Sequence, residues 1–250
     1  MIYRSHTDRW NEGNVFYRIK TFCYNESDRN DNVYLHALIG VFSEIVSDRE
    51  RFAGEGFEFF AKHGQATLAT RTSLGINRLP RANETVIFKA WVSSYKDMRM
   101  YNEVQALSVD GELLVSCLLT SRTIDTKTLE VIRPESFAGT LPVTDERRSG
   151  APECSKVVAK GEPEPLGSYA VRYCDIDTHG NMNNSRYTEL VTNLLPEDTV
   201  CRIPREYVIN HTRRVLPGDT IELFREREEN AYRTFGFVEG NQCFASEHRF

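Results

Sequence analysis

The sequence predicts an α+β chain built from two similar halves, each a curved antiparallel sheet wrapped around one long helix. The first observation behind this prediction is an order of elements, strand then helix then four strands, that occurs twice. The second is that matching turns recur, since Asp110-Gly111 and Glu239-Gly240 each separate the last two strand-like runs of their half. The third is a segment rich in proline and glycine between the halves.

The first half begins with a strand over residues 15–24, where apolar and polar residues alternate. A helix follows, because apolar residues then recur at helical spacing: Tyr34, Leu35, Leu38, Val41, Phe42 and Ile45. Strand-like runs come next, at 66–77, 84–94, 99–109 and 112–124. This half therefore holds one helix and enough strands to form a sheet around it.

The second half repeats this order. A strand is expected near 168–174 and a helix near 183–195. Further strands are expected near 205–215, 219–227, 231–238 and 242–249. The segment around Leu79-Pro80 also resembles the segment around Leu216-Pro217, so the repeat includes the turns before equivalent strands.

Residues 139–165 contain several prolines and glycines and few apolar residues, which is typical of a surface linker. We therefore predict an N-terminal domain over 1–140, a linker over 141–165 and a C-terminal domain over 166–250. The alternative is that part of the linker, residues 156–159, forms an extra edge strand.

Composition limits the partners. The chain has 250 residues, of which 40% are hydrophobic, and this is enough for a substantial core. Its net charge is −5 and it contains no long run of Lys and Arg, so nucleic acid is not an expected partner. No apolar run approaches the length of about 18 residues that a transmembrane helix needs, so no membrane partner is expected either.

The cysteines and the first residues indicate the compartment. The six cysteines are scattered and form no Cys-x-x-Cys pair, so we expect reduced thiols. The stretch 1–8 lacks the apolar core of a signal peptide. We therefore expect a cytoplasmic protein.

Chemistry-bearing side chains are concentrated in residues 172–187. Asp175, Asp177, His179 and Asn181 precede Asn183 and Asn184, which are good helix N-caps. A helix start carries roughly half a positive charge, which suits a developing oxyanion. Asp177 and His179 then offer a base or a nucleophile. The alternative is an Asx-rich loop whose side chains only bond their own backbone.

Metal and nucleotide sites are not expected. The histidines lack the spacing of metal ligands. Gly54-Glu55-Gly56 begins like a dinucleotide fingerprint but lacks the third glycine and a preceding strand. No Gly-x-Ser-x-Gly elbow is present. We therefore predict no metal and no cofactor.

The segment around Asp177 resembles the Asp-x-Asp-x-x-Gly-His-Val-Asn-Asn signature of hotdog-fold thioesterases. More specifically, nearly the whole chain resembles the acyl-ACP thioesterase family of plants and bacteria. Its Leu79-Pro80, Glu84-Thr85-Val86-Ile87 and Ala90-Trp91 are similar to the family pattern Tyr-Pro...Glu-x-Val-x-Ile-x-Thr-Trp. The resemblance implies tandem hotdog folds fused as a pseudo-dimer, in which the first domain binds the acyl chain and the second carries the catalytic loop.

The resemblance also implies the activity. It implies hydrolysis of the thioester of acyl-phosphopantetheine on acyl carrier protein, with release of free fatty acid. The implied catalytic residues are Asp177, His179 and Asn181. The implied substrate-binding residues are Gly180, Met182, Asn183, Asn184 and Arg214.

The chain departs from the family at two places. His179 and Asn181 stand in the reverse of the plant order, and Arg214 occupies the position of a family Glu. Because a general base is thereby replaced by a permanent cation, a second function stays open. That alternative is noncatalytic binding of acyl thioesters, or a diverged hotdog protein that acts on acyl-CoA. The sequence also leaves open whether Asp177 is a nucleophile or orients water, and whether two chains pair as a homodimer.

Overall fold

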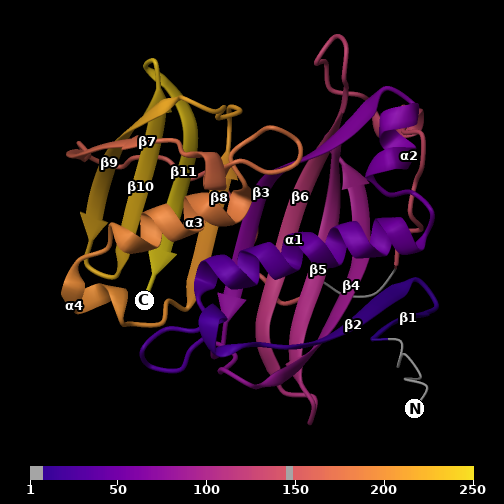
Figure 1. Ribbon diagram of the computed structural model, residues 1–250, viewed down its shortest axis with the longest axis horizontal. Helices are drawn as coiled ribbons and strands as arrows, with labels where there is room; N and C mark the ends of the chain where they lie inside the picture. Colours follow the sequence, from indigo (N-terminus) through magenta and orange to yellow (C-terminus); the bar gives the residue numbers. More distant parts are fainter. Residues whose placement is uncertain (1–7, 145–148) are drawn as a thin grey trace.

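The computed structural model describes residues 8–144 and 149–250, and within them one eleven-stranded sheet runs through both halves of the chain (Figure 1). The first half contributes β1 (Arg9–Glu12), β2 (Val15–Thr21), β3 (Gln65–Ile76), β4 (Thr85–Lys96), β5 (Arg99–Ser108) and β6 (Leu113–Asp125). The second half contributes β7 (Glu164–Ala170), β8 (Glu206–His211), β9 (Thr220–Glu228), β10 (Ala231–Val238) and β11 (Asn241–Arg249). The helices are α1 (Leu35–Phe52), α2 (Phe57–Lys62), α3 (Asn184–Asn193) and α4 (Glu197–Val200). The short 3₁₀ turns are η1 (Tyr24–Glu26), η2 (Pro134–Ser136) and η3 (Tyr173–Asp175).

The halves join at the middle of the sheet. The strand order is β1-β2-β4-β5-β6-β3-β8-β11-β10-β9-β7, so β3 of the first half pairs with β8 of the second. That pairing is antiparallel and aligns Arg71 with Asn210 and Gly75 with Glu206. Backbone hydrogen bonds therefore cross from one half to the other, and neither half has a free sheet edge at the junction.

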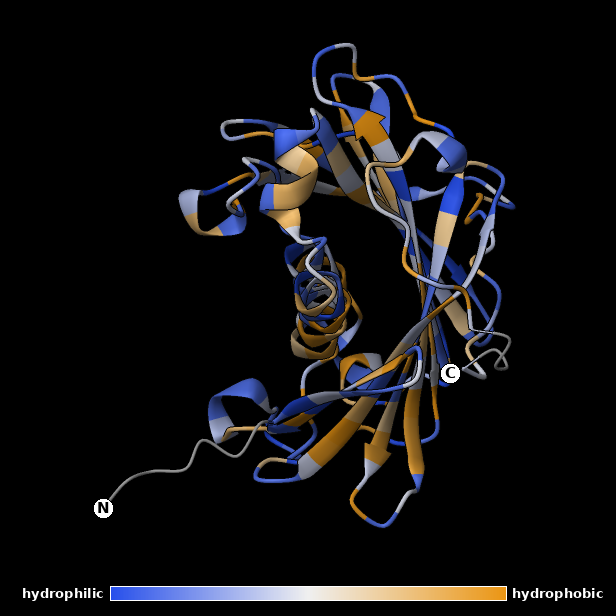
Figure 2. Cartoon of the chain, turned by 90° about the vertical axis from the view of Figure 1, so that its right-hand side faces the viewer, coloured by the Kyte–Doolittle hydropathy of each residue, from blue (hydrophilic) through white to orange (hydrophobic). Residues whose placement is uncertain are grey.

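Both central helices lie on the concave side of this sheet. Figure 2 looks along α1 and shows the sheet curving around it. A Cβ on Gly40 of α1 would lie 3.8 Å from the Cβ of Ser185 in α3, so the two helices approach closely near their N-terminal ends. The predicted architecture of tandem hotdog folds is confirmed.

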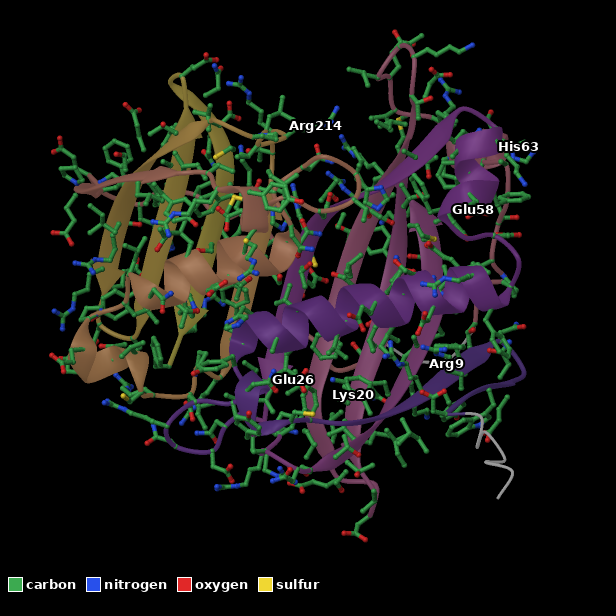
Figure 3. The ribbon with its side chains drawn as sticks, viewed as in Figure 1. Arg9, Lys20, Glu26, Glu58, His63 and Arg214 are labelled. Atoms are coloured by element: carbon green, nitrogen blue, oxygen red, sulfur yellow. The ribbon has the colours of Figure 1, made fainter. Side chains whose placement is uncertain are left out.

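Buried apolar side chains of α1 pack against the sheet. Leu38, Phe42 and Ile45 are fully buried and recur at intervals of three and four residues. The helix extends to Phe52, beyond the apolar pattern that predicted it, because charged residues continue its buried face. Asp48 is one of them, and it forms ion pairs with Arg9 and Arg18. Figure 3 labels Arg9, which lies below the C-terminal part of α1 in that view.

Several elements differ from their predicted positions. The strand expected near 168–174 is β7 at Glu164–Ala170, and η3 occupies the end of the expected range. Residues 156–159 form no strand. Instead the N–H of Val157 donates to Oδ1 of Asn210 at 2.7 Å, and its side chain packs with Val208, Phe235 and Ala245. The elements β1, α2 and α4 were not predicted, because each is too short to show a periodic pattern.

The structure does not test two of the expectations drawn from the sequence. The division at residues 140 and 166 stays a prediction, and residues 1–7, which bear on the absence of a signal peptide, lie outside the described range. No helix in the described part of the chain is long and apolar enough to cross a membrane.

Candidate functional site

The Asp177 loop, which we define as residues 176–183, connects η3 to α3. A bridge between Ile176 and Met182 closes its base. The N–H of Asp177 donates to the carbonyl of Asn181 at 2.9 Å, and the N–H of Gly180 donates to the carbonyl of Asp177 at 3.0 Å. Gly180 has φ +74°, a conformation that glycine adopts without a steric penalty. The loop is thus a tight turn held by its own backbone.

Only one of the two carboxylate oxygens of Asp177 accepts hydrogen bonds within this turn. Its Oδ1 accepts from the backbone N–H of His179 at 2.8 Å and of Asn181 at 3.3 Å. Its Oδ2 has no hydrogen-bond partner among the described residues. One oxygen therefore holds the loop, and the other is available for chemistry.

The start of α3 leaves one backbone donor unused. Asn183 is the N-cap, and its Oδ1 accepts from the N–H of Ser185 at 2.9 Å and from its hydroxyl at 2.8 Å. The sequence predicted that Asn184 could also cap the helix, but Asn184 is the first residue of the helix itself. Its N–H has no acceptor among the described residues, so it is an unused donor at this helix start.

The two backbone donors just before Asn184 are occupied. Met182 donates to the carbonyl of Val215 at 2.9 Å, and Asn183 donates to that of Asp175 at 2.8 Å. The side chain of Met182 is buried in the main core. The roles in substrate binding that the sequence predicts for Gly180, Met182, Asn183, Asn184 and Arg214 stay predictions.

His179 points toward the first half of the chain. Its ring meets the ring of Phe57, the first residue of α2, edge to face with centroids 4.6 Å apart. The imidazole makes no hydrogen bond among the described residues, so it is not bonded to the Asp177 carboxylate. Phe57 is 59% exposed, so the pair sits at the surface where the halves meet.

Arg214 binds the loop from outside. Its Nε donates to Oδ1 of Asn181 at 2.5 Å, while Nδ2 of Asn181 donates to the carbonyl of His179 at 3.4 Å. The orientation of the Asn181 amide is thereby set. Figure 3 labels Arg214 beside this loop, in the segment between β8 and β9. Its remaining guanidinium nitrogens have no partner among the described residues.

Below the loop lies a buried aromatic layer that the sequence did not reveal. Tyr187 packs edge to face on His211, with centroids 4.9 Å apart, and on Phe244 at 5.3 Å. Burial is the main cause that raises the pKa of Tyr187, and the charges of Asp177 and Asp219 add to it. Burial also lowers the pKa of His211 to about 4. Both groups are therefore neutral near pH 7.

The first half repeats the turn. In the Asp28 loop, which we define as residues 27–34, Oδ1 of Asp28 accepts from the N–H of Asn30 at 2.8 Å and of Asn32 at 2.9 Å. A bridge between Ser27 and Val33 closes its base. Because the same hydrogen bonds form in both halves, the turn itself is structural. Any chemistry lies in what differs between the two loops.

Three differences stand out. Asn30 occupies the position of His179, and Asp31, at φ +67°, occupies that of Gly180. Tyr34 is the N-cap of α1 but forms no side-chain cap, unlike Asn183. Only the Asp177 loop thus combines a free carboxylate oxygen, an imidazole and an amide-capped helix start.

Each loop also contacts the opposite half. Nη2 of Arg29 donates to Sγ of Cys201, just after α4, at 2.8 Å. The contact between His179 and Phe57 is its counterpart at α2. Among the described residues, no group of His, Cys, Asp and Glu side chains is arranged to hold a metal ion.

Comparisons with known proteins agree with this architecture. The family model of the acyl-ACP thioesterase N-terminal domain matches residues 13–137, and that of the acyl-ACP thioesterase C-terminal domain matches residues 160–243. Together the two matches span most of the chain. No curated protein sequence matches it.

Two solved structures are similar to the whole chain. One is an acyl-ACP thioesterase from Bacteroides thetaiotaomicron, with a TM-score of 0.81 and 16% identity over 95% of this chain and 98% of that one. The other is a 12:0-ACP thioesterase from Umbellularia californica, with a TM-score of 0.79 and 16% identity over 96% of this chain and 98% of that one. At this identity the likeness establishes the shared fold.

Proposed function

The chain belongs to the acyl-ACP thioesterase family, and from this premise we propose that it hydrolyses acyl thioesters of acyl carrier protein at the Asp177 loop. The observation that carries the proposal is the pairing of two unused groups, Oδ2 of Asp177 and the N–H of Asn184, at the start of α3. The products are a free fatty acid and the carrier with its thiol. A cytoplasmic location belongs to the same proposal.

The proposed oxyanion site is the start of α3. The thioester oxygen accepts from the N–H of Asn184, where the partial positive charge of the helix start favours a developing negative charge. One such donor is worth about 3 kcal/mol in the transition state. Asn183 keeps this end of the helix in place as its cap.

The proposed attack comes from Asp177. As a base, its Oδ2 takes a proton from water while the oxygen of that water bonds to the thioester carbon. The carbon–sulfur bond then breaks, and the thiolate takes up a proton. As a nucleophile, Oδ2 would bond to the carbon itself and form an anhydride that water opens. His179 and Asn181 orient the water in either route.

We further propose that the substrate spans both halves. The acyl chain lies between α1 and the sheet of the first half, whose facing residues are largely apolar. The pantetheine phosphate meets the free guanidinium nitrogens of Arg214, because this exposed cation stands beside the loop. Pairing of two chains into a homodimer is not needed, since the fused halves already bring α1 and α3 together.

The test is release of free thiol from acyl-ACP and acyl-CoA substrates across a range of chain lengths. We expect turnover with acyl-ACP, and its loss in the Asp177→Asn variant. The absence of thiol release at every chain length, from protein that still binds acyl thioesters, would refute the proposal.

That outcome would support the second candidate function, noncatalytic binding of acyl thioesters. Two observations favour it. Asp177 makes the same hydrogen bonds as Asp28 in the other half, and Arg214 stands where the resemblance described above implies a Glu. Both assays use the same protein and substrates, so one set of measurements distinguishes the two functions.

A further inference from the structure

The core of the first half changes from apolar to polar along α1. Leu38, Phe42 and Ile45 face the sheet at successive core positions of the helix. The next position on that stripe is Arg49, which is only 5% exposed. A guanidinium therefore stands where the helical pattern calls for an apolar side chain.

The facing strands change in the same direction. The registers of β3, β5 and β6 place core-facing side chains in rows across the sheet. The first two rows are apolar: Ala106, Val115 and Ile76, then Val104, Cys117 and Leu74. The following rows introduce polar residues: Asn102 and Thr72, then Ser121, then Thr123 and Thr67. Arg49 bonds to Asn102, so the polar rows lie under the C-terminal part of α1.

This polar cluster, which we define as Arg49, Glu50, Thr67, Asn102 and Ser121, is incompletely bonded. Nη2 of Arg49 donates to Oδ1 of Asn102 at 2.6 Å. Buried atoms without a hydrogen-bond partner come from each of its residues: Nε and Nη1 of Arg49, Oε1 of Glu50, Oγ1 of Thr67, Nδ2 of Asn102 and Oγ of Ser121. Four separate elements thus place unpartnered polar atoms in one part of the core.

Unpartnered buried polar groups are costly, and a buried guanidinium is the most costly of these. Arg49 forms no ion pair among the described residues, although the charges of Glu50 and Glu55 act on its pKa. Burial lowers the pKa of Arg49 and raises the pKa of Glu50 to about 7. The cluster therefore presents several buried donors and acceptors that a bound polar group can satisfy.

The cluster lies in line with the proposed acyl-chain site. Gly40 marks the point where α1 meets α3, and Arg49 follows nine residues later. At 1.5 Å per residue this is about 14 Å along the helix, past the apolar rows. A chain that enters near the Asp177 loop and follows α1 would meet the cluster with its far end.

We infer that the polar cluster binds a hydroxyl group carried near the far end of the acyl chain, so that hydroxylated acyl chains are the preferred substrates. A hydroxyl both accepts and donates, which matches the free N–H groups of Arg49 and Asn102 and the free oxygen of Glu50. A terminal carboxylate fits less well, because it would face Glu50 and Glu55. The inference rests on the proposed function for the course of the acyl chain.

The test is binding of free fatty acids, which requires no catalysis. Isothermal titration calorimetry would compare ω-hydroxylated and unsubstituted fatty acids of matched length, over a series of lengths. We expect hydroxylated acids that reach the cluster to bind about tenfold more tightly, as one hydrogen bond to a charged donor implies. The Arg49→Met and Asn102→Leu variants should lose this difference.

Arg51→Met is the matched control, because Arg51 lies on the same helix, is exposed and pairs with Asp48. It should keep the preference. If Arg49→Met does not fold, Asn102→Leu and Thr67→Val still test the cluster. Equal binding of both acid types at every length, binding of neither type, or a preference that survives both core substitutions would overturn the inference. A hydroxyl preference in protein that releases no thiol would uphold the site and reject the hydrolytic function.

Discussion

Asp177 and Asp28 form matching turns but have different neighbours, and this makes them a natural pair for testing. We expect Asp177→Asn to lower turnover by about 100-fold to 10,000-fold, the usual range for loss of a general base. Stability should hardly change, because the asparagine Oδ1 can still accept from the N–H groups of His179 and Asn181. Steady-state kinetics and thermal denaturation measure the two effects.

Asp28→Asn is the control. It makes the same change in the same turn, away from the imidazole and the capped start of α3. Its turnover should stay close to that of the unmodified protein. Equal losses in both variants would mean that the turn matters only for folding, and full activity of Asp177→Asn would remove Asp177 from the mechanism.

A second prediction at this scale concerns Arg214. If its free nitrogens bind the pantetheine phosphate, Arg214→Met should raise KM for acyl-ACP about tenfold and weaken its dependence on salt. Arg213→Met is the control, since that neighbouring exposed arginine pairs with Glu239 instead. A KM that is unchanged in Arg214→Met but raised in Arg213→Met would contradict the assignment.

The sequence identified the loop but not the use of its groups. Spacing alone placed Asp177, His179 and Asn181 before a helix, since Asx residues and glycine signal a turn and a cap. It could not show that Asn184 is the residue whose N–H stays free. That depends on which neighbouring N–H groups find a carbonyl in the segment after β8, as Met182 does at Val215. The contact with Phe57 was equally hidden, since it joins distant parts of the chain.

At the scale of single elements, the start of α3 makes a separate prediction. Asn183 accepts two hydrogen bonds from Ser185. Asn183→Ala should lower the free energy of unfolding by about 1 kcal/mol, and Asn183→Ser should restore most of it. Urea denaturation measures the change. Asn193→Ala, at the exposed last turn of the same helix, should have little effect; a loss there as large as at Asn183 would speak against a specific capping role.

The central helix of the first half shows where pattern reasoning stops. Apolar spacing predicted it only as far as Ile45, yet it runs seven residues further to Phe52. Asp48 and Arg49 continue the buried stripe with charged groups, which a hydrophobic pattern counts as exposed. Their burial depends on Arg9, Arg18 and Asn102, three residues from strands that only the fold brings together.

At the scale of the whole molecule, the repeat was readable but its assembly was not. The two halves follow from the repeated order of elements and turns. Pairing of β3 with β8 does not, because both strands already have the pattern of sheet strands and nothing local specifies their partner. The junction is the antiparallel pairing of β3 with β8, the strands that hold equivalent places in the two halves.

Stability of the whole molecule should depend on pH through His248. This side chain is 1% exposed on β11, and both ring nitrogens lack a partner. Burial lowers its pKa from 6.5 to about 3. As the pH falls, the unfolded chain therefore binds this proton at a higher pH than the folded chain does. The contribution of neutral His248 to the free energy of unfolding is complete above pH 6.5 and is lost as the pH falls toward 3. Glu50 gives the free energy of unfolding the opposite dependence on pH. Its pKa is raised to about 7, so the fold loses stability as the pH rises and this carboxyl group ionises.

His211, whose pKa burial lowers to about 4, adds a slope of the same sign as that of His248, and substitution of His248 isolates its own contribution. We expect His248→Phe to remove a loss of about 1.4 kcal/mol per pH unit between pH 6 and 4, because the phenyl ring cannot bind a proton. Urea denaturation at a series of pH values would give the free energy of unfolding of both proteins. The control is His63→Gln, since His63 is exposed beyond the end of α2 (Figure 3) and its substitution should leave the slope unchanged. If His248→Phe and the unmodified protein lose stability in parallel as the pH falls, His248 does not carry the acid sensitivity of the fold.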